Sequence, residues 1–139
     1  IFLMTGQETY ALILVAICIW REARGESMEA KRGVGWTIRN RVLAAGWFGK
    51  GWVDVILKPW QFSSFNAKDP NAVKLPHEIS QGWEECLLVA HEVIAGAGTD
   101  PTGGATHYFD NSMNGNPPAW AVGQTPTVEI GAFNFYKIA

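Results

Sequence analysis

The acidic side chains at the end of an apolar run are the residues whose types and spacing best suit catalysis in this sequence. Residues 10–20 are apolar, and the motif Glu-Ala-Arg-Gly-Glu follows at residues 22–26. Gly25 is the residue type commonly found just past a helix end, so we expect Glu22 in the last turn of a buried helix. Apolar neighbours such as Trp20 disfavour the charged form of a carboxyl group, which suits a general acid. An ordinary helix end, whose carboxylates only pair with the neighbouring arginines, explains the same residues.

The composition predicts one globular domain that spans residues 1–139. The chain is 47% hydrophobic and 17% charged, and its formal net charge of -2 argues against a nucleic-acid partner. The apolar run at residues 10–20 is too short to cross a bilayer, so we expect no stable membrane insertion. We expect Cys18 and Cys86 to be small buried apolar residues. Seven tryptophans exceed the needs of a core of this size; most should pack in it, and some could line a carbohydrate-binding cleft.

The elements that must position this motif are mostly helical, which predicts an α+β fold with a small β element. Thr5 and Glu8 have the spacing of a capping box at the start of the first helix. The glycines at 33 and 35 cost helix propensity but permit close helix approach. The expected elements are helices over residues 7–24, 28–45 and 77–95, a turn over 55–57 capped by Asp54, an extended segment over 60–65, a strand over 106–109 and a hairpin over 127–136.

Several segments, in order along the chain, together resemble the cell-wall hydrolase family that includes the catalytic domain of bacterial spore-cortex-lytic enzymes. The matching segments are residues 22–26, 39–42, 61–63, 100–109, 130–131 and 135–136. The resemblance implies a lysozyme-like fold, a single catalytic domain and cleavage of the peptidoglycan glycan strand. It also implies that Glu22 is the catalytic acid. Family members often carry a histidine two residues before the final aromatic pair, where this chain has Phe133.

The number of carboxylates at work decides between two kinds of glycoside cleavage. A hydrolytic muramidase or glucosaminidase of the usual kind needs a second carboxylate beside the acid. Glu26 is the obvious candidate in the sequence, although Gly25 is expected to turn the chain between it and Glu22. A lytic transglycosylase needs only one glutamate, because the 6-hydroxyl of the muramic sugar attacks and a 1,6-anhydro-muramic end results. We expect the second reaction, with Glu22 as acid and then base, at the bond between N-acetylmuramic acid (MurNAc) and N-acetylglucosamine (GlcNAc).

Other side chains are expected to bind the sugars. They carry suitable hydrogen-bonding groups, and the candidates are Glu26, Gln61, Ser63, His107 and Tyr108. We expect Arg24 to pair with Glu26 and Asp100 to cap the turn before Pro101. The expected partner is peptidoglycan, bound by a monomer that acts on the cell wall after secretion, in the periplasm or after delivery by a phage.

Two other classes of protein fit the composition less well. A zinc amidase would need ligands such as the three histidines, at 77, 91 and 107, but no close histidine pair occurs. We therefore expect no metal and no cofactor. A non-catalytic wall-binding domain would carry tandem repeats, which this sequence lacks.

Overall fold

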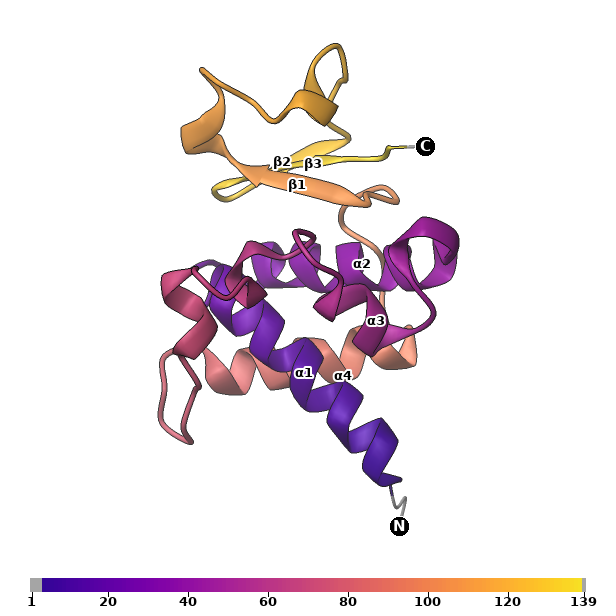
Figure 1. The fold of residues 1–139 in the computed structure, drawn as a ribbon, viewed down its shortest axis with the longest axis vertical. Coiled ribbons are helices and arrows are strands. Elements are labelled where there is room, and N and C mark those ends of the chain that lie inside the picture. The colour runs from indigo at the N-terminus through magenta and orange to yellow at the C-terminus, as the bar shows by residue number, and fades with distance from the viewer. Residues whose placement is uncertain (1–3, 139) are drawn as a thin grey trace.

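The helices form the larger part of the molecule, and a small antiparallel sheet lies against one side of them (Figure 1). The computed structural model describes residues 4–138. Its helices and strands confirm the α+β, mostly helical class. The helices are α1 (Gly6–Ala23), α2 (Met28–Ala44), α3 (Trp52–Leu57) and α4 (Trp83–Ala95), and the strands are β1 (His107–Asp110), β2 (Val128–Ile130) and β3 (Phe133–Tyr136). Short 3-10 helices lie between them: η1 (Gly46–Phe48), η2 (Ser63–Phe65), η3 (Pro70–Val73), η4 (Asn111–Met113) and η5 (Ala119–Ala121).

Helix α1 begins at the predicted capping box. The Thr5 hydroxyl accepts the backbone N–H of Glu8 at 3.0 Å, and the Glu8 carboxylate accepts the N–H of Thr5 at 3.2 Å. The helix ends at Ala23, one residue before the predicted end. The expected glycine cap is wrong, because Gly25 has no left-handed φ and a Cβ atom there would meet no other atom within 4 Å. The helix end therefore does not depend on this glycine.

Two glycines let α2 pack closely on both sides. A Cβ atom at Gly33 would lie 2.5 Å from the Phe135 ring on β3, and one at Gly35 would lie 2.9 Å from Val89 on α4. The predicted close approach of another helix is confirmed at Gly35, whereas at Gly33 it is the sheet that approaches. Helix α2 thus lies between the sheet and α4, and Figure 1 shows it directly below the strands.

Helix α4 is shorter than predicted. It begins at Trp83, because Gly82 has φ 73°, a left-handed conformation that an α-helix does not continue through. Residues 77–82 form turns, and Ile79 is 83% exposed. The buried positions of α4 are Cys86, Val89, Ala90 and Val93. Cys86 and Cys18 are both buried, as predicted, and both are free thiols.

The predicted hairpin forms the centre and one edge of the sheet. The strand order is β1-β3-β2, with Tyr108 opposite Phe135 and Ile130 opposite Phe133. The expected extended segment at 60–65 is instead a turn followed by η2. Asp54 lies within α3 and does not cap it, since the helix already begins at Trp52. In the described part of the chain, no helix is both long and apolar enough to cross a membrane.

Candidate active site

Glu22 lies where the end of α1 meets the sheet. It is half-buried in the last turn of the helix, as predicted. The Tyr108 hydroxyl on β1 donates a hydrogen bond of 2.5 Å to its Oε1 atom, across 86 positions of sequence. This bond joins the helical part of the molecule to the sheet at the carboxylate itself.

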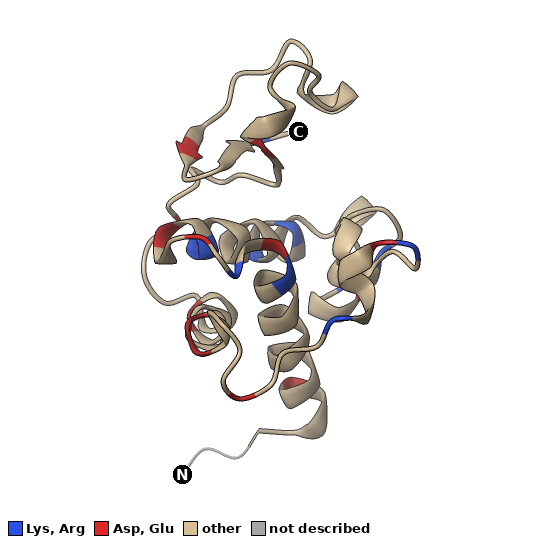
Figure 2. Ribbon diagram, turned by 90° about the vertical axis from the view of Figure 1, so that its left-hand side faces the viewer, with Lys and Arg blue, Asp and Glu red and all other residues tan. Residues whose placement is uncertain are grey.

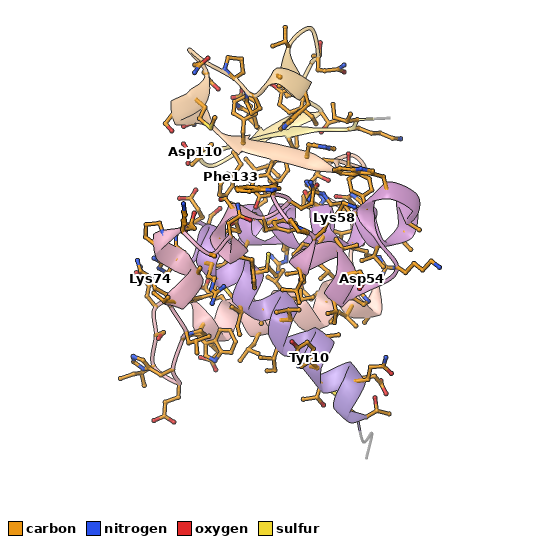
Figure 3. All side chains as sticks on the ribbon, in the orientation of Figure 1. Tyr10, Asp54, Lys58, Lys74, Asp110 and Phe133 are labelled. Atoms are coloured by element: carbon orange, nitrogen blue, oxygen red, sulfur yellow. The ribbon has the colours of Figure 1, made fainter. Side chains whose placement is uncertain are left out.

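Two aromatic rings from β3 hold Tyr108. The Phe133 ring packs edge-on against it at 5.2 Å between ring centroids, and Phe135 lies at 5.6 Å. Burial, and then the negative charge of Glu22, raise the pKa of Tyr108 well above its usual value. Tyr108 therefore stays a neutral phenol at neutral pH and donates its proton to the hydrogen bond. In Figure 3 the labelled Phe133 lies between the sheet and the helices.

The buried guanidinium of Arg41 joins α2 to Gln61 and to Thr106, the residue before His107. Its Nε atom donates to the backbone oxygen of Thr106 at 2.6 Å, and Nη1 donates to Gln61 Oε1 at 3.4 Å. The group lies 4.8 Å from the Phe62 ring centroid and 5.3 Å from that of Phe48. Arg41 is only 4% exposed, so α2 buries this charged side chain.

The charge of Arg41 interacts with the charged and titratable groups around Glu22. Burial lowers the pKa of Arg41, while the nearby Tyr108 and Glu22 act in the opposite direction. Burial, followed by the charge of Glu22, raises the pKa of Cys18, which keeps this inner thiol neutral. The buried positive charge of Arg41 thus lies close enough to interact with Glu22. Figure 2 shows basic and acidic positions together where the helices face the sheet.

Glu26 holds the turn of the β2–β3 hairpin. Its Oε1 atom accepts the backbone N–H of Ala132 at 3.1 Å. Gly131 in this turn has φ 56°, and a Cβ atom there would lie 3.0 Å from the same oxygen. The backbone oxygen of Glu26 accepts a hydrogen bond from Lys31 Nζ at 2.5 Å, and Lys31 is buried. Both ends of Glu26 are therefore fixed.

The predicted pair of Arg24 with Glu26 is wrong. The Arg24 guanidinium lies 4.7 Å from the Trp20 ring centroid and donates to the backbone oxygens of Trp20 and Arg21 and to Asn71 Oδ1. Arg24 closes the end of its own helix, because the last carbonyls of α1 need donors that the helix cannot supply.

Comparisons with known proteins agree with this architecture. The sequence pattern of the Cell Wall Hydrolase family matches residues 25–136. The chain belongs to the cell wall hydrolase family. The matched range includes Glu26 and the β1–β3 sheet, and it begins just after Glu22. The comparison with curated proteins finds no match.

Two solved structures share the fold of this cell wall hydrolase. One is the catalytic domain of the Bacillus cereus SleB protein, with 25% identity, a TM-score of 0.74, and coverage of 97% of this chain and 95% of that one. The other is the catalytic domain of a germination-specific lytic transglycosylase, SleB from Bacillus anthracis, with 24% identity, a TM-score of 0.74, and coverage of 97% and 100%. The likeness confirms the lysozyme-like α+β fold and the resemblance to the spore-cortex-lytic enzymes.

The remaining predicted binding residues of this cell wall hydrolase are not all brought together. Gln61 is half-buried and contacts Arg41, whereas Ser63 is exposed on η2. His107 is half-buried beside the Trp120 ring at 4.8 Å, and its Nδ1 atom lies 2.9 Å from Thr106 Oγ1. Burial, and then the charge of Arg41, lower the pKa of His107 to about 4. The imidazole is therefore neutral at neutral pH.

Asp100 caps its turn, as predicted. Its carboxylate accepts the backbone N–H of Thr102 at 2.8 Å, that of Gly104 at 3.0 Å and the side-chain amide of Asn40 at 2.9 Å. Burial acts to raise the pKa of Asp100, but these hydrogen bonds outweigh it and the pKa is lowered. Asp100 thus joins α2 to the turn that leads into β1.

The three histidines do not form a cluster. His77 lies in a turn and His91 on α4, both exposed, and His107 lies on β1. Among residues 4–138, no group of three or more His, Cys, Asp or Glu side chains is placed to hold a metal ion. The absence of a metal requirement stays a prediction, which activity after treatment with a chelator would test.

Proposed function

We propose that the chain is a lytic transglycosylase that cleaves the MurNAc–GlcNAc bonds of peptidoglycan, with Glu22 as general acid and then general base. The family to which the chain belongs acts on the cell wall. A solved structure with the same fold is described as a germination-specific lytic transglycosylase. The observation that carries the proposal is the hydrogen bond from Tyr108 to Glu22 Oε1, which fixes one carboxylate at the junction of α1 and β1.

The reaction needs a single proton that Glu22 gives and recovers. The protonated carboxyl donates to the glycosidic oxygen as the bond from C1 of MurNAc to that oxygen breaks, and the leaving sugar gains a hydroxyl group. The carboxylate then takes the proton of the C6 hydroxyl as O6 bonds to C1, which forms the 1,6-anhydro ring. No water is consumed. Because Tyr108 occupies Oε1, Oε2 is the oxygen left to exchange this proton.

The surroundings of Glu22 support a reaction with one carboxylate. The nearest acidic residue in sequence, Glu26, is bound at Oε1 by the Ala132 N–H, which gives it a structural task. The buried Arg41 guanidinium, which Glu22 and Tyr108 influence by their charge, supplies a positive charge close to the site. Peptidoglycan is the proposed partner and the cell wall the place of action; the monomeric state stays a prediction.

The test is the Glu22→Gln variant, assayed by the clearing of purified peptidoglycan. General acid catalysis contributes about 10²- to 10⁴-fold, so we expect a loss of that order with an unchanged melting temperature. Glu84→Gln, at an exposed position in the first turn of α4, is the matched control and should keep full activity. A folded Glu22→Gln variant that clears the wall as fast as the control would refute the proposed acid.

The products decide between the transglycosylase and a hydrolytic muramidase or glucosaminidase. Transglycosylation should release muropeptides that end in anhydro-muramic acid, one water lighter than hydrolysis products. Digestion in water enriched in heavy oxygen should leave these ends unlabelled. Labelled ends with a free reducing terminus would show a hydrolase instead and would make Glu26 the first residue to examine as a second carboxylate.

A further inference from the structure

Trp60 combines a strained backbone with an exposed side chain. Its φ is 69°, the left-handed region that bulky residues seldom adopt, and its side chain is 81% exposed. The backbone N–H donates to Asn66 Oδ1 at 3.2 Å, which holds the turn in this conformation. A large apolar ring in water recovers little of the strain by burial. The packing of the fold therefore does not account for a tryptophan at this position, and such strain often accompanies binding.

The Trp60 side chain borders a surface hollow of about 610 Å³ between the end of α3 and η2. This volume lies within the range of roughly 300–1,000 Å³ that is usual for small-molecule sites. The residues that line it include Lys58, Trp60, Phe65, Asn66 and Lys68. Two aromatic residues, an asparagine and two lysines thus line one concave surface.

The charged residues that line the hollow are all positive. Lys58 and Lys68 are basic, and of the described residues that line the hollow none is acidic. The ammonium group of Lys58 lies 4.6 Å from the Trp47 ring centroid, which fixes it at one end. This arrangement fits a ligand with an apolar face and a carboxylate. A sugar ring that bears an acidic substituent has both, since one face of a pyranose presents C–H groups.

The hollow adjoins the helix end that carries Glu22. The Arg21 guanidinium lies 4.6 Å from the centroid of the Phe65 ring, and its Nη1 atom donates to the backbone oxygen of Ser64 at 3.3 Å. On the other side, Gln61 follows Trp60 in the chain and contacts Arg41. In Figure 3, the labelled Lys58 lies in the helical part, below the level of Phe133. A polymer bound at Glu22 can therefore extend over the hollow.

We propose that this hollow, bordered by Trp60, Phe65, Lys58 and Lys68, is a second binding site for the glycan strand. A sugar ring of the strand stacks on the Trp60 indole, and a carboxylate of the peptide that the muramyl sugar carries pairs with Lys58 or Lys68. The inference rests on the proposed function, because the occupant is the strand that Glu22 cleaves. The site would hold the strand away from the scissile bond and would favour polymers over single disaccharides.

The Trp60→Gly variant tests the stacking with little risk to the fold. Glycine adopts φ 69° without strain, so the melting temperature should stay the same or rise. Trp60→Asn is the second variant, because asparagine also tolerates this conformation. Tyr10→Ala is the matched control: Tyr10 is an aromatic residue 57% exposed on α1, and Figure 3 shows it at the far end of the molecule from the sheet.

Binding is measured in the Glu22→Gln background, so that turnover does not consume the ligand. The probes are soluble glycan strands with their peptides, released from purified peptidoglycan, and chitohexaose as a neutral strand. Stacking on an aromatic ring is worth about 1–3 kcal/mol where it has been measured for nucleic-acid bases, so we expect Kd to rise about tenfold in Trp60→Gly and Trp60→Asn for both probes. A double Lys58→Gln, Lys68→Gln variant should weaken binding of the peptidoglycan strands and leave chitohexaose unchanged.

The outcomes separate this inference from the proposed function. Equal Kd values for the Trp60 variants and for Tyr10→Ala would overturn the stacking, and an unchanged Kd of the double lysine variant for peptidoglycan strands would overturn the carboxylate pairing. Failure of the wild-type chain to cleave peptidoglycan would instead overturn the proposed function. In that case the Glu22→Gln background still reports whether strands bind at Trp60.

Discussion

Replacement of Glu26 distinguishes a structural glutamate from a second catalytic carboxylate. In the structure its Oε1 atom accepts the Ala132 N–H at 3.1 Å and so ties the loop after α1 to the β2–β3 turn. Glu26→Gln keeps an oxygen at this position and removes only the charge. Glu26→Ala removes the acceptor as well. If Glu26 only positions the hairpin, Glu26→Ala should destabilise the fold more than Glu26→Gln. Glu26→Gln should also have little effect on turnover.

The magnitude follows from the bond that is lost. A hydrogen bond to a charged group contributes about 1.5–3 kcal/mol, and one between neutral groups about 0.5–1.5 kcal/mol. Glu26→Gln should therefore cost about 1 kcal/mol of the free energy of unfolding, and Glu26→Ala about 2 kcal/mol. In a domain of this size each kcal/mol corresponds to a fall in melting temperature of roughly 3–5 °C.

Thermal unfolding and clearing of purified peptidoglycan are the two assays. Glu26→Gln should keep its activity within a few-fold of the wild type, whereas a catalytic carboxylate would lose about 10²-fold or more on the same change. Glu129→Gln, at an exposed position on β2, is the matched control for the loss of one charge. A folded Glu26→Gln variant as inactive as Glu22→Gln would refute both the positioning role and the mechanism with one carboxylate.

Three further variants test other contacts. Tyr108→Phe keeps the ring and removes the donor to Glu22, so activity on peptidoglycan should fall about tenfold or more with little change in melting temperature; full activity would contradict the role of this bond. The pKa of His107 is lowered to about 4 by burial, so its neutral form stabilises the fold above pH about 6.5, and roughly 1–2 kcal/mol is lost as the pH falls from there toward 4. Melting temperatures of wild type and His107→Gln should converge over that window, and parallel curves would refute the argument. Gly33→Ala places a methyl group 2.5 Å from the Phe135 ring and should cost about 1–3 kcal/mol, measured by urea unfolding; an unchanged midpoint would contradict the close packing.

Local signals in the sequence predicted the elements whose ends depend on neighbouring residues. The capping box of Thr5 and Glu8 is present because its two hydrogen bonds join atoms three positions apart, and the turn at Gly131 joins two strands that pair with each other. The predicted start of α4 was wrong because it depends on a contact that is distant in the sequence. Pro76 suits a first helical turn, but Gly82 packs against the backbone oxygen of Arg24, where a Cβ atom would lie 2.5 Å away, and this contact comes from α1.

The contacts of the candidate site were less predictable than its residues. Glu22 and Tyr108 could be named from the sequence, but the hydrogen bond between them spans 86 positions and depends on how the sheet docks on α1. Arg41 was missed, because helical periodicity gives its direction but not the aromatic rings that cover it. The strain at Trp60 could not be predicted from the sequence, because a tryptophan gives no indication that its backbone adopts a positive φ.

One series of contacts explains why the small sheet is needed at all. Gly33 leaves room for the Phe135 ring beside α2, and Phe135 in turn packs against the Tyr108 ring. Tyr108 then reaches Glu22 with its hydroxyl, while Glu26 accepts the Ala132 N–H in the turn of the hairpin. The contacts of Gly33, Glu22 and Glu26 cross from the helical part to the sheet, so a displacement of the hairpin moves the donor away from the carboxylate. The helices alone could carry Glu22, but only the docked sheet fixes the direction of its free oxygen.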